Sequence, residues 1–334
     1  MILSKCGEIP EVNRGTLRKA FLMVLVSIFL YAALLFYADA QKVGAILGNF
    51  DFSVLLILLS LSILCYLTRT IRLLYLMRLL KAKINFQEAF YLQFSGMTMT
   101  ITPGKIGEVF KAFLARELVG FPVAKGVALV FVERLTDLVA VILLSLGGLM
   151  TFKGSFSSLG ILIILTAAIT VLFSTDWFQK AFLSLLSRTK YAERFKGSFN
   201  EIFATIRTCL NLKPLLVSII LAVIGWGSEG IAFYLTLKEL DFGAFNVFQA
   251  ISVYAVSTIA GALAMLPGGI GLTEGSMIAI LMASGATRYV SFAATMIIRF
   301  TTLWFGVISG WLVFLFTKRD ITKKMLEKPQ SDLP

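Results

Sequence analysis

The sequence predicts an all-α, polytopic integral membrane protein with about six spanning helices and two helical pairs that are broken by Pro-Gly motifs. Of its 334 residues, 58% are hydrophobic and only 15% are charged, against roughly 45–50% and 25% in soluble domains. The mean hydropathy is +0.87. A chain of this length has no soluble core large enough to bury so much apolar surface. We therefore treat residues 1–334 as a single membrane domain.

Six apolar runs are long enough to cross a bilayer, since a spanning helix needs about 20 residues. They are Phe21–Ala38, Phe52–Leu67, Val123–Met150, Leu159–Ser174, Leu215–Leu237 and Thr287–Phe316. The first run follows a polar segment of nearly twenty residues. No small-residue cleavage site follows this run, so we expect a retained span rather than a signal peptide.

Two further apolar stretches, Ala89–Val119 and Val247–Ala283, are each interrupted by a short Pro-Gly motif. The breaks at residues 102–107 and 266–271 contain Pro103, Gly104 and Gly107, and Pro267, Gly268 and Gly271, respectively. Proline cannot continue the helical hydrogen-bond ladder, and glycine adds conformational freedom. Each break therefore separates two short helices. Such a pair either re-enters the membrane from one side or crosses it as two thin spans.

The two breaks are copies of one another. Pro-Gly-x-Ile-Gly occurs in both, 164 positions apart, and the match continues 165 positions apart, where Arg134 corresponds to Arg299. We therefore predict a duplication, with repeat A at residues 52–150 and repeat B at residues 213–316. Three crossings between the breaks would place the copies on opposite sides, which is the inverted repeat of many transporters. The copies would not lie on opposite sides if each broken pair crossed the membrane once.

The distribution of Lys and Arg predicts that both termini lie inside. Under this topology the inner segments carry 21 basic residues and the outer segments carry four, as the positive-inside rule requires in a cytoplasmic membrane. The net charge of +12 thus needs no nucleic-acid partner. Residues 176–213 form a basic, amphipathic stretch, which we expect to lie on the cytoplasmic surface. It either connects the two halves or docks a partner.

Several ionisable residues lie in the apolar segments, where each costs roughly 2.5–3.5 kcal/mol to insert. We expect a lipid head-group to be held by Arg134, Arg299 and Lys105 and by the helix-terminal glycines Gly104, Gly107, Gly268 and Gly271. We expect charge pairing or proton coupling from Glu108, Glu133, Asp137, Glu229 and Glu274. Pro103 and Pro267 break the helices. The alternative is that these charges are internal ion pairs that fix helix register.

The composition also excludes several kinds of site. The chain has no histidine, and its three cysteines, Cys6, Cys65 and Cys209, are far apart in the sequence. We therefore expect no disulfide framework, no metal site and no cofactor. No P-loop, G-x-S-x-G or other catalytic motif occurs, so we expect no catalytic residue.

Three motifs give a resemblance to a known family. The segments T-P-G-K-I-G-E-V-F-K-A-F-L, V-F-V-E-R-L-T-D-L and L-P-G-G-I-G-L-T-E-G together look like the lysylphosphatidylglycerol synthase transmembrane-region family, also called the flippase-like domain family. The resemblance covers roughly Phe52–Phe316 and implies lipid translocation. In the multiple peptide resistance factor, a similar domain is fused to a cytosolic aminoacyl-transferase. Only Lys318–Pro334 follows the last span here, so we expect a free-standing relative.

The expected function is therefore translocation of a phospholipid or polyprenyl-phosphate-linked head-group through a polar groove. The groove would be lined by buried arginines and acidic residues, and membrane lipids would be the partners. One alternative is an integral-membrane enzyme acting on a lipid-linked sugar, with Glu108, Glu133 or Asp137 as a base. Another is a scaffold that recruits a lipid-modifying synthase through the basic stretch. Without an ATP-binding motif, transport is downhill or driven by a gradient.

Overall fold

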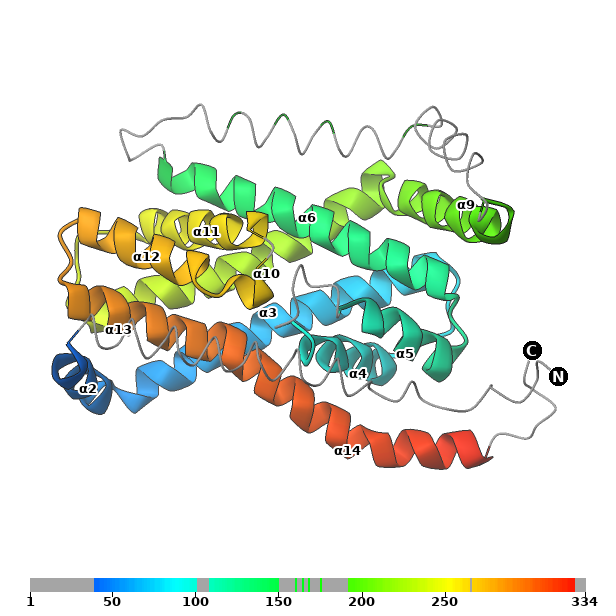
Figure 1. Cartoon of the computed structure of the whole chain (residues 1–334), viewed down its shortest axis with the longest axis horizontal. Helices are drawn as coiled ribbons and strands as arrows, with labels where there is room; N and C mark the ends of the chain where they lie inside the picture. The colour runs from blue at the N-terminus through cyan, green and yellow to red at the C-terminus, as the bar shows by residue number, and fades with distance from the viewer. Residues whose placement is uncertain are drawn as a thin grey trace.

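The computed structural model describes residues 39–100, 108–149, 192–264 and 266–327, with Gly160, Ile164, Ala168 and Thr175 (Figure 1). Within these residues the regular structure is helical and contains no strand, as predicted. By length and composition, three of these helices can cross a membrane, namely Phe52–Leu79, Leu212–Glu239 and Arg288–Phe316. The predicted span at Phe21–Ala38 lies outside the described residues, and so does almost all of that at Leu159–Ser174.

Helix α2 (Ala40–Asn49) was not predicted, and α3 (Phe52–Leu79) is longer than predicted. The Asp51 carboxylate caps α3 by accepting the Ser53 N–H at 2.8 Å, an ordinary N-cap interaction. The predicted end at Leu67 is wrong because the helix continues through three arginines, Arg69, Arg72 and Arg78, that the predicted topology places in a loop. One of them, Arg72, is buried and paired with a carboxylate, so its charge does not end the helix.

The first broken pair consists of α4 (Phe86–Met97) and α5 (Phe110–Val119), and α6 (Val123–Leu149) follows. A capping box opens α4. The Asn85 side chain accepts the Glu88 N–H at 2.8 Å, and the Glu88 carboxylate accepts the Asn85 N–H at 2.9 Å. The break therefore lies between two helices, as predicted.

In the second half, α9 (Ala192–Cys209) and α10 (Leu212–Glu239) precede α11 (Val247–Leu263). A second capping box opens α11, where Asn246 and Gln249 exchange hydrogen bonds at 2.9 Å. Asn246 lies 161 positions after the cap of α4. The first short helix of each half thus begins in the same way.

The second broken pair consists of α11 and α12 (Leu272–Ala283), separated by a tight turn at Pro267–Gly269. Gly268 and Gly269 adopt φ angles of 60° and 70°, which other residues adopt only with strain. A Cβ on Gly269 would also lie 2.6 Å from the Thr273 hydroxyl oxygen. The glycines are therefore required by the turn itself.

The last long helix is continuous but not uniform. It consists of α13 (Arg288–Arg299), one turn of π-helix at Phe300–Trp304 and α14 (Phe305–Glu327). The Thr302 carbonyl, within the π turn, accepts a hydrogen bond from the Tyr66 hydroxyl at 2.7 Å. Such turns are frequent at functional sites.

The last helix of each half packs on the first short helix of the other half's broken pair. At the centre, α3 crosses α10 so closely that a Cβ on Gly225 would lie 2.6 Å from the Thr68 hydroxyl oxygen. Helix α6 packs on α11, and α14 packs on α4. In Figure 1, α4 and α5 lie toward one end of the molecule, and α11 and α12 lie toward the other.

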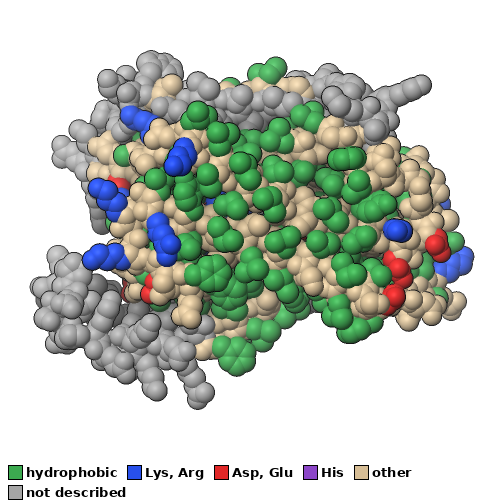
Figure 2. Space-filling view, turned by 180° about the vertical axis from the view of Figure 1, so that it is seen from behind, with side chains coloured by type: hydrophobic (Ala, Val, Ile, Leu, Met, Phe, Trp, Pro, Cys, Tyr) green, Lys and Arg blue, Asp and Glu red, His purple; other side chains and the backbone are tan. Residues whose placement is uncertain are grey.

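The face in Figure 2 is broadly hydrophobic. Large apolar side chains stand exposed on helices α3, α10 and α14, among them Phe52, Ile220 and Leu315. Lys and Arg gather toward one end of this face, and several acidic side chains lie toward the other (Figure 2). An apolar belt between polar ends is typical of helices that face lipid.

Candidate functional site

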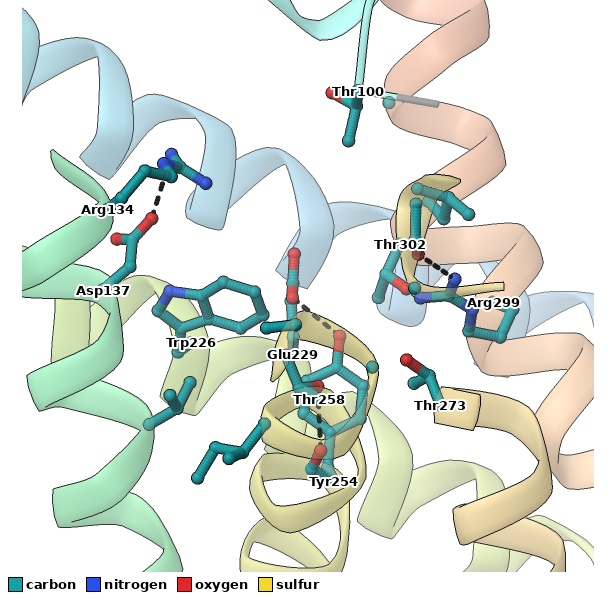
Figure 3. A pocket seen from close by; sticks show the side chains of 18 of the residues that line it. Thr100, Arg134, Asp137, Trp226, Glu229, Tyr254, Thr258, Thr273, Arg299 and Thr302 are labelled. Carbon is teal, nitrogen blue, oxygen red and sulfur yellow. Dashed lines mark hydrogen bonds and ion pairs between the residues drawn. The ribbon is translucent and has the colours of Figure 1, made fainter. Parts of the chain in front are cut away.

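A cavity of about 410 Å³ lies between the two halves of the molecule. It is lined by residues of α3, α6, α10 and α11, by the turn at Pro267–Gly269 and by the helix around the π turn (Figure 3). Its charged lining residues are Arg69, Arg134, Asp137, Glu229 and Arg299. Four of these five were predicted from the sequence, and Gly268 also lines the cavity.

The two halves line the cavity with corresponding positions. The corresponding pairs are Tyr66 with Trp226, Arg69 with Glu229, Arg134 with Arg299, Asp137 with Thr302 and Leu138 with Leu303. The first two pairs are separated by 160 positions and the other three by 165. Two of the five pairs nevertheless differ in charge, because Arg69 corresponds to Glu229 and Asp137 corresponds to Thr302.

Asp137 is the centre of a charge cluster on α6. Its Oδ1 lies 2.7 Å from Arg72 Nη1, and its Oδ2 lies 3.0 Å from Arg134 Nη2. The same Arg134 nitrogen lies 3.3 Å from Glu108 Oε2. The side chain of Arg134 is 27% exposed and that of Arg72 only 1%. Arg134 can therefore reach a ligand in the cavity, whereas Arg72 serves the internal pair.

Arg299 is held by the second break. Its Nε donates to Glu274 Oε1 at 2.6 Å, and its Nη2 donates to the Gly268 carbonyl at 2.7 Å. The other oxygen of Glu274 accepts the Gly271 N–H at 2.7 Å. The sequence predicts that Gly271 binds a head-group, but the Glu274 carboxylate already accepts its N–H. Arg299 and Glu274 thus tie α12 and its preceding turn to α13.

Glu229 lies deep in the cavity beside an aromatic pair. Its Oε2 accepts a hydrogen bond from the Tyr254 hydroxyl at 2.7 Å (Figure 3). Trp226 lies one turn earlier on α10. The Arg69 guanidinium stacks over its ring, with Arg69 Cζ 4.7 Å from the ring centroid. Sequence reasoning missed Arg69, Trp226 and Tyr254. Arg69 could have been found from the repeat, because it lies 160 positions before Glu229, close to the 164 positions that separate the two breaks.

Glu133 does not line the cavity. Its Oε2 accepts a hydrogen bond from Lys111 Nζ at 2.7 Å, and the same ammonium donates to Gln93 Oε1 at 3.1 Å. The side chains of Glu133 and Lys111 are 1% and 6% exposed. This buried pair joins α5 to α6, so Glu133 fits the internal-pair alternative.

Four predicted residues of the first break lie outside the described residues, namely Pro103, Gly104, Lys105 and Gly107. Glu108, which follows them, contacts Arg134 at the edge of the cavity. Of the second break, the backbone of Pro267 forms the start of the turn. The structure thus brings Arg134, Asp137 and Glu108 together on one side and the break of the second half on the other.

Comparisons with known proteins agree with this architecture. Residues 24–310 match the family model described as "Lysylphosphatidylglycerol synthase TM region". The chain is 27% identical over 237 residues to UPF0104 membrane protein MJ1078 of Methanocaldococcus jannaschii, which covers 67% of this chain and 96% of that protein. It is 24% identical over 327 residues to UPF0104 membrane protein MJ1595 of the same organism, covering 92% and 97%. To UPF0104 membrane protein PH1989 of Pyrococcus horikoshii it is 21% identical over 329 residues, covering 90% and 98%.

Proposed function

Because the chain belongs to the lysylphosphatidylglycerol synthase TM region family, we propose that it moves a lipid head-group across the cytoplasmic membrane through its central cavity. One observation carries this proposal. Among the residues that the structure describes, five charged side chains surround an internal cavity of about 410 Å³, in a molecule with a broadly apolar face. Each such charge is expensive at bilayer depth, and intramembrane charges of this kind mark substrate pathways.

The substrate we propose is a phospholipid or a polyprenyl-phosphate-linked lipid. Its head-group would enter the cavity and contact Arg134, while the tail would stay in the bilayer beside the exposed apolar side chains of α3, α10 and α14. Without an ATP-binding motif, movement is downhill or coupled to a gradient. Asp137 and Glu229 are the carboxylates that line the cavity, and they are the candidates for coupling.

We further propose that both broken pairs are re-entrant and that the halves form an inverted repeat with both termini inside. The matching capping boxes of α4 and α11 and the corresponding positions around the cavity support this arrangement. So do the places of the broken pairs at opposite ends of the molecule in Figure 1. In such transporters the substrate lies near the midplane, between discontinuous helices.

The experiment is a transport assay in reconstituted vesicles. Head-group-labelled phosphatidylglycerol, lysyl-phosphatidylglycerol, phosphatidylethanolamine and a polyprenyl phosphate would be followed by loss of label to an impermeant quencher. Arg134→Ala is expected to slow movement by about 10–100-fold, because a hydrogen bond to a charged group contributes ~1.5–3 kcal/mol. Arg116→Ala is the matched control, since Arg116 is exposed on α5 and does not line the cavity.

The same preparation tests the two alternatives. An integral-membrane enzyme would change the mass of an added lipid-linked substrate, which transport does not. A scaffold for a lipid-modifying synthase would tolerate Arg134→Ala and respond to charge reversal between residues 176 and 213. No movement of any lipid by folded protein, with or without a proton gradient, would refute the transport proposal.

A further inference from the structure

We infer that Arg69, Trp226 and Arg134 form an oxyanion site for a phosphate group on the cavity wall where α3, α6 and α10 meet. This inference rests on the proposed function and narrows it, because it assigns the head-group contact to a phosphate. Arg299, which the sequence also predicts as a head-group ligand, is bonded to Glu274 and to the Gly268 carbonyl, so the site uses Arg69 beside Arg134 instead.

Arg69 differs from the other two arginines of the cavity in its ion pairing. Arg134 pairs with Asp137 and Glu108, and Arg299 pairs with Glu274. Among the residues that the structure describes, Arg69 forms no ion pair, and its buried Nε has no hydrogen-bond partner. Its guanidinium is supported from one side by the ring of Trp226, a cation–π contact that leaves the N–H edge available.

Two further donors line the same cavity without an acceptor. Trp226 is only 8% exposed, and its buried indole Nε1 has no hydrogen-bond partner in the described part of the chain. The same is true of Arg134 Nε. Figure 3 draws Trp226, Arg134 and Asp137 among the side chains that line this cavity. Leaving a buried donor unsatisfied is costly, so a bound acceptor would stabilise all three groups.

The salt bridge between Arg72 and Asp137 explains why these donors converge. Arg69 lies one turn before Arg72 on α3, and Arg134 lies one turn before Asp137 on α6. Arg72 and Asp137 are joined at 2.7 Å, and Arg134 folds back to Asp137 at 3.0 Å. The guanidinium groups of Arg69 and Arg134 therefore both flank this buried pair.

The charges on this wall are balanced. Arg69, Arg72 and Arg134 contribute three positive charges, and Asp137, Glu108 and Glu229 contribute three negative charges. Glu229 accepts a hydrogen bond from the Tyr254 hydroxyl and makes no ion pair with Arg69 among the described contacts. The case for an anion at Arg69 therefore rests on its N–H groups and not on an excess of positive charge.

The donor set also fits phosphate in shape. A guanidinium presents parallel N–H groups that match two phosphate oxygens, and an indole N–H provides a third directed bond. A lipid phosphate and a free phosphate ion offer the same oxygens. The test must therefore separate these two sources.

Fluorescence of Trp226 reports on the site directly. The chain has four tryptophans, and replacing Trp177, Trp304 and Trp311 with Phe leaves Trp226 as the single reporter. The full-length protein in an uncharged detergent is titrated with dihexanoyl phosphatidylglycerol, with dihexanoylglycerol, which lacks phosphate, and with inorganic phosphate. We expect saturable quenching or a spectral shift with the phospholipid and none with dihexanoylglycerol.

Variants locate the binding. Arg69→Gln is expected to weaken phospholipid binding by about tenfold or more, since it removes a charge-assisted contact. Arg116→Gln, an exposed arginine outside the cavity, is expected to leave it unchanged and controls for general attraction to anions. Size-exclusion and thermal unfolding establish folding. If Arg69→Gln does not fold, Arg69→Lys keeps the charge but loses the bidentate geometry and is expected to weaken binding several-fold.

Each possible outcome of these measurements is decisive. Equal binding of dihexanoylglycerol, or unchanged phospholipid binding in the folded Arg69 variants, would overturn the oxyanion site. Inorganic phosphate binding as tightly as the phospholipid would support the site but assign it to free phosphate. Phosphate-lipid binding at Trp226 without transport in vesicles would refute the proposed function alone, and transport without Arg69-dependent binding would refute the site alone.

Discussion

At the residue scale, Arg299 and Arg134 occupy corresponding positions but serve different purposes. Arg299 is 7% exposed and is bonded to Glu274 and Gly268, so it holds the second break in place. Arg134 is about one quarter exposed and faces the cavity. Substitutions at the two positions should therefore have different consequences, one for stability and the other for transport.

Arg299→Ala is expected to lower the free energy of unfolding by about 3–5 kcal/mol, because it leaves the fully buried Glu274 carboxylate uncompensated. Chemical unfolding in detergent measures this loss. Arg288→Ala, at the exposed start of the same helix, should change stability by no more than about 0.5 kcal/mol. Equal stability of the two variants would contradict the assigned role of Arg299.

The pair formed by Lys111 and Glu133 gives a second prediction. Lys111→Met alone leaves a buried carboxylate unpaired and is expected to cost about 3–5 kcal/mol. The double variant Lys111→Met/Glu133→Leu removes both charges and should recover most of that loss. Unfolding measurements of the four proteins form a double-mutant cycle. Loss of transport in a stable double variant would show that Glu133 does more than fix packing.

The residues found from the sequence share one property. Each is a charged residue within a long apolar run, so a hydropathy profile is enough to identify it. They are Arg134, Asp137, Glu229 and Arg299. Arg69 lies at the end of such a run, where a charge normally marks the membrane boundary. The partner of Arg72 is 65 positions away, and no local pattern predicts that contact. Lys111 and Tyr254 escaped prediction for the same reason.

At the scale of elements, helix type and most boundaries followed from hydrophobic length and from the Pro-Gly motifs. The end of α3 and the presence of α2 did not. Tertiary ion pairing keeps the end of α3 helical, and α2 is a short helix packed mainly against α13. The π turn after Arg299 was also not predictable, because the Tyr66 hydroxyl that bonds its Thr302 carbonyl lies 236 positions away in the sequence.

The turn between α11 and α12 depends on its glycines. Gly269→Ala is expected to destabilise the protein by at least about 1–2 kcal/mol, because its φ is 70° and the new Cβ meets the Thr273 hydroxyl. Gly275→Ala is the matched control, since Gly275 lies in α12 with open space around it. That change should stabilise the protein by up to about 1 kcal/mol. The melting temperatures of the two variants in detergent should move in opposite directions.

Helix α9 can be tested through its buried thiol. Burial raises the pKa of Cys209 to about 12 from an ordinary 9.0, which lowers the thiolate fraction at pH 8 by roughly 1000-fold. Maleimide should therefore label Cys209 slowly, and the rate should rise with pH toward that pKa. Ala204→Cys in a Cys209→Ala background is the exposed control on the same helix. Equal labelling rates would show that α9 does not stay packed on α6.

At the scale of the whole molecule, the proposed re-entrant topology makes a prediction about sidedness. In a chain without its native cysteines, Lys83→Cys and Glu117→Cys lie before α4 and after most of α5, and both positions are exposed. They should react with an impermeant reagent only from the cytoplasmic side. Gly243→Cys and Arg288→Cys, at the ends of the second pair, should react only from the other side.

Opposite labelling of Lys83→Cys and Glu117→Cys would mean that the first pair crosses the membrane. The inverted repeat would then fail, because the number of crossings between the breaks would change. Labelling of all four positions from one side would contradict the proposal that the two broken pairs open to opposite sides of the membrane. The two results are distinguishable, since the first divides the labelling within one broken pair and the second does not.

The corresponding positions around the cavity have an energetic consequence. If the two halves exchanged conformations, an ideal repeat would give two states of equal energy, one open to each side of the membrane. Here Arg69 corresponds to Glu229 and Asp137 corresponds to Thr302, so the exchange does not regenerate the same set of contacts. The equilibrium constant between the inward- and outward-facing states would then be set at these two pairs of positions. Swapping Arg69 with Glu229 would change which state is the ground state while leaving the total charge constant.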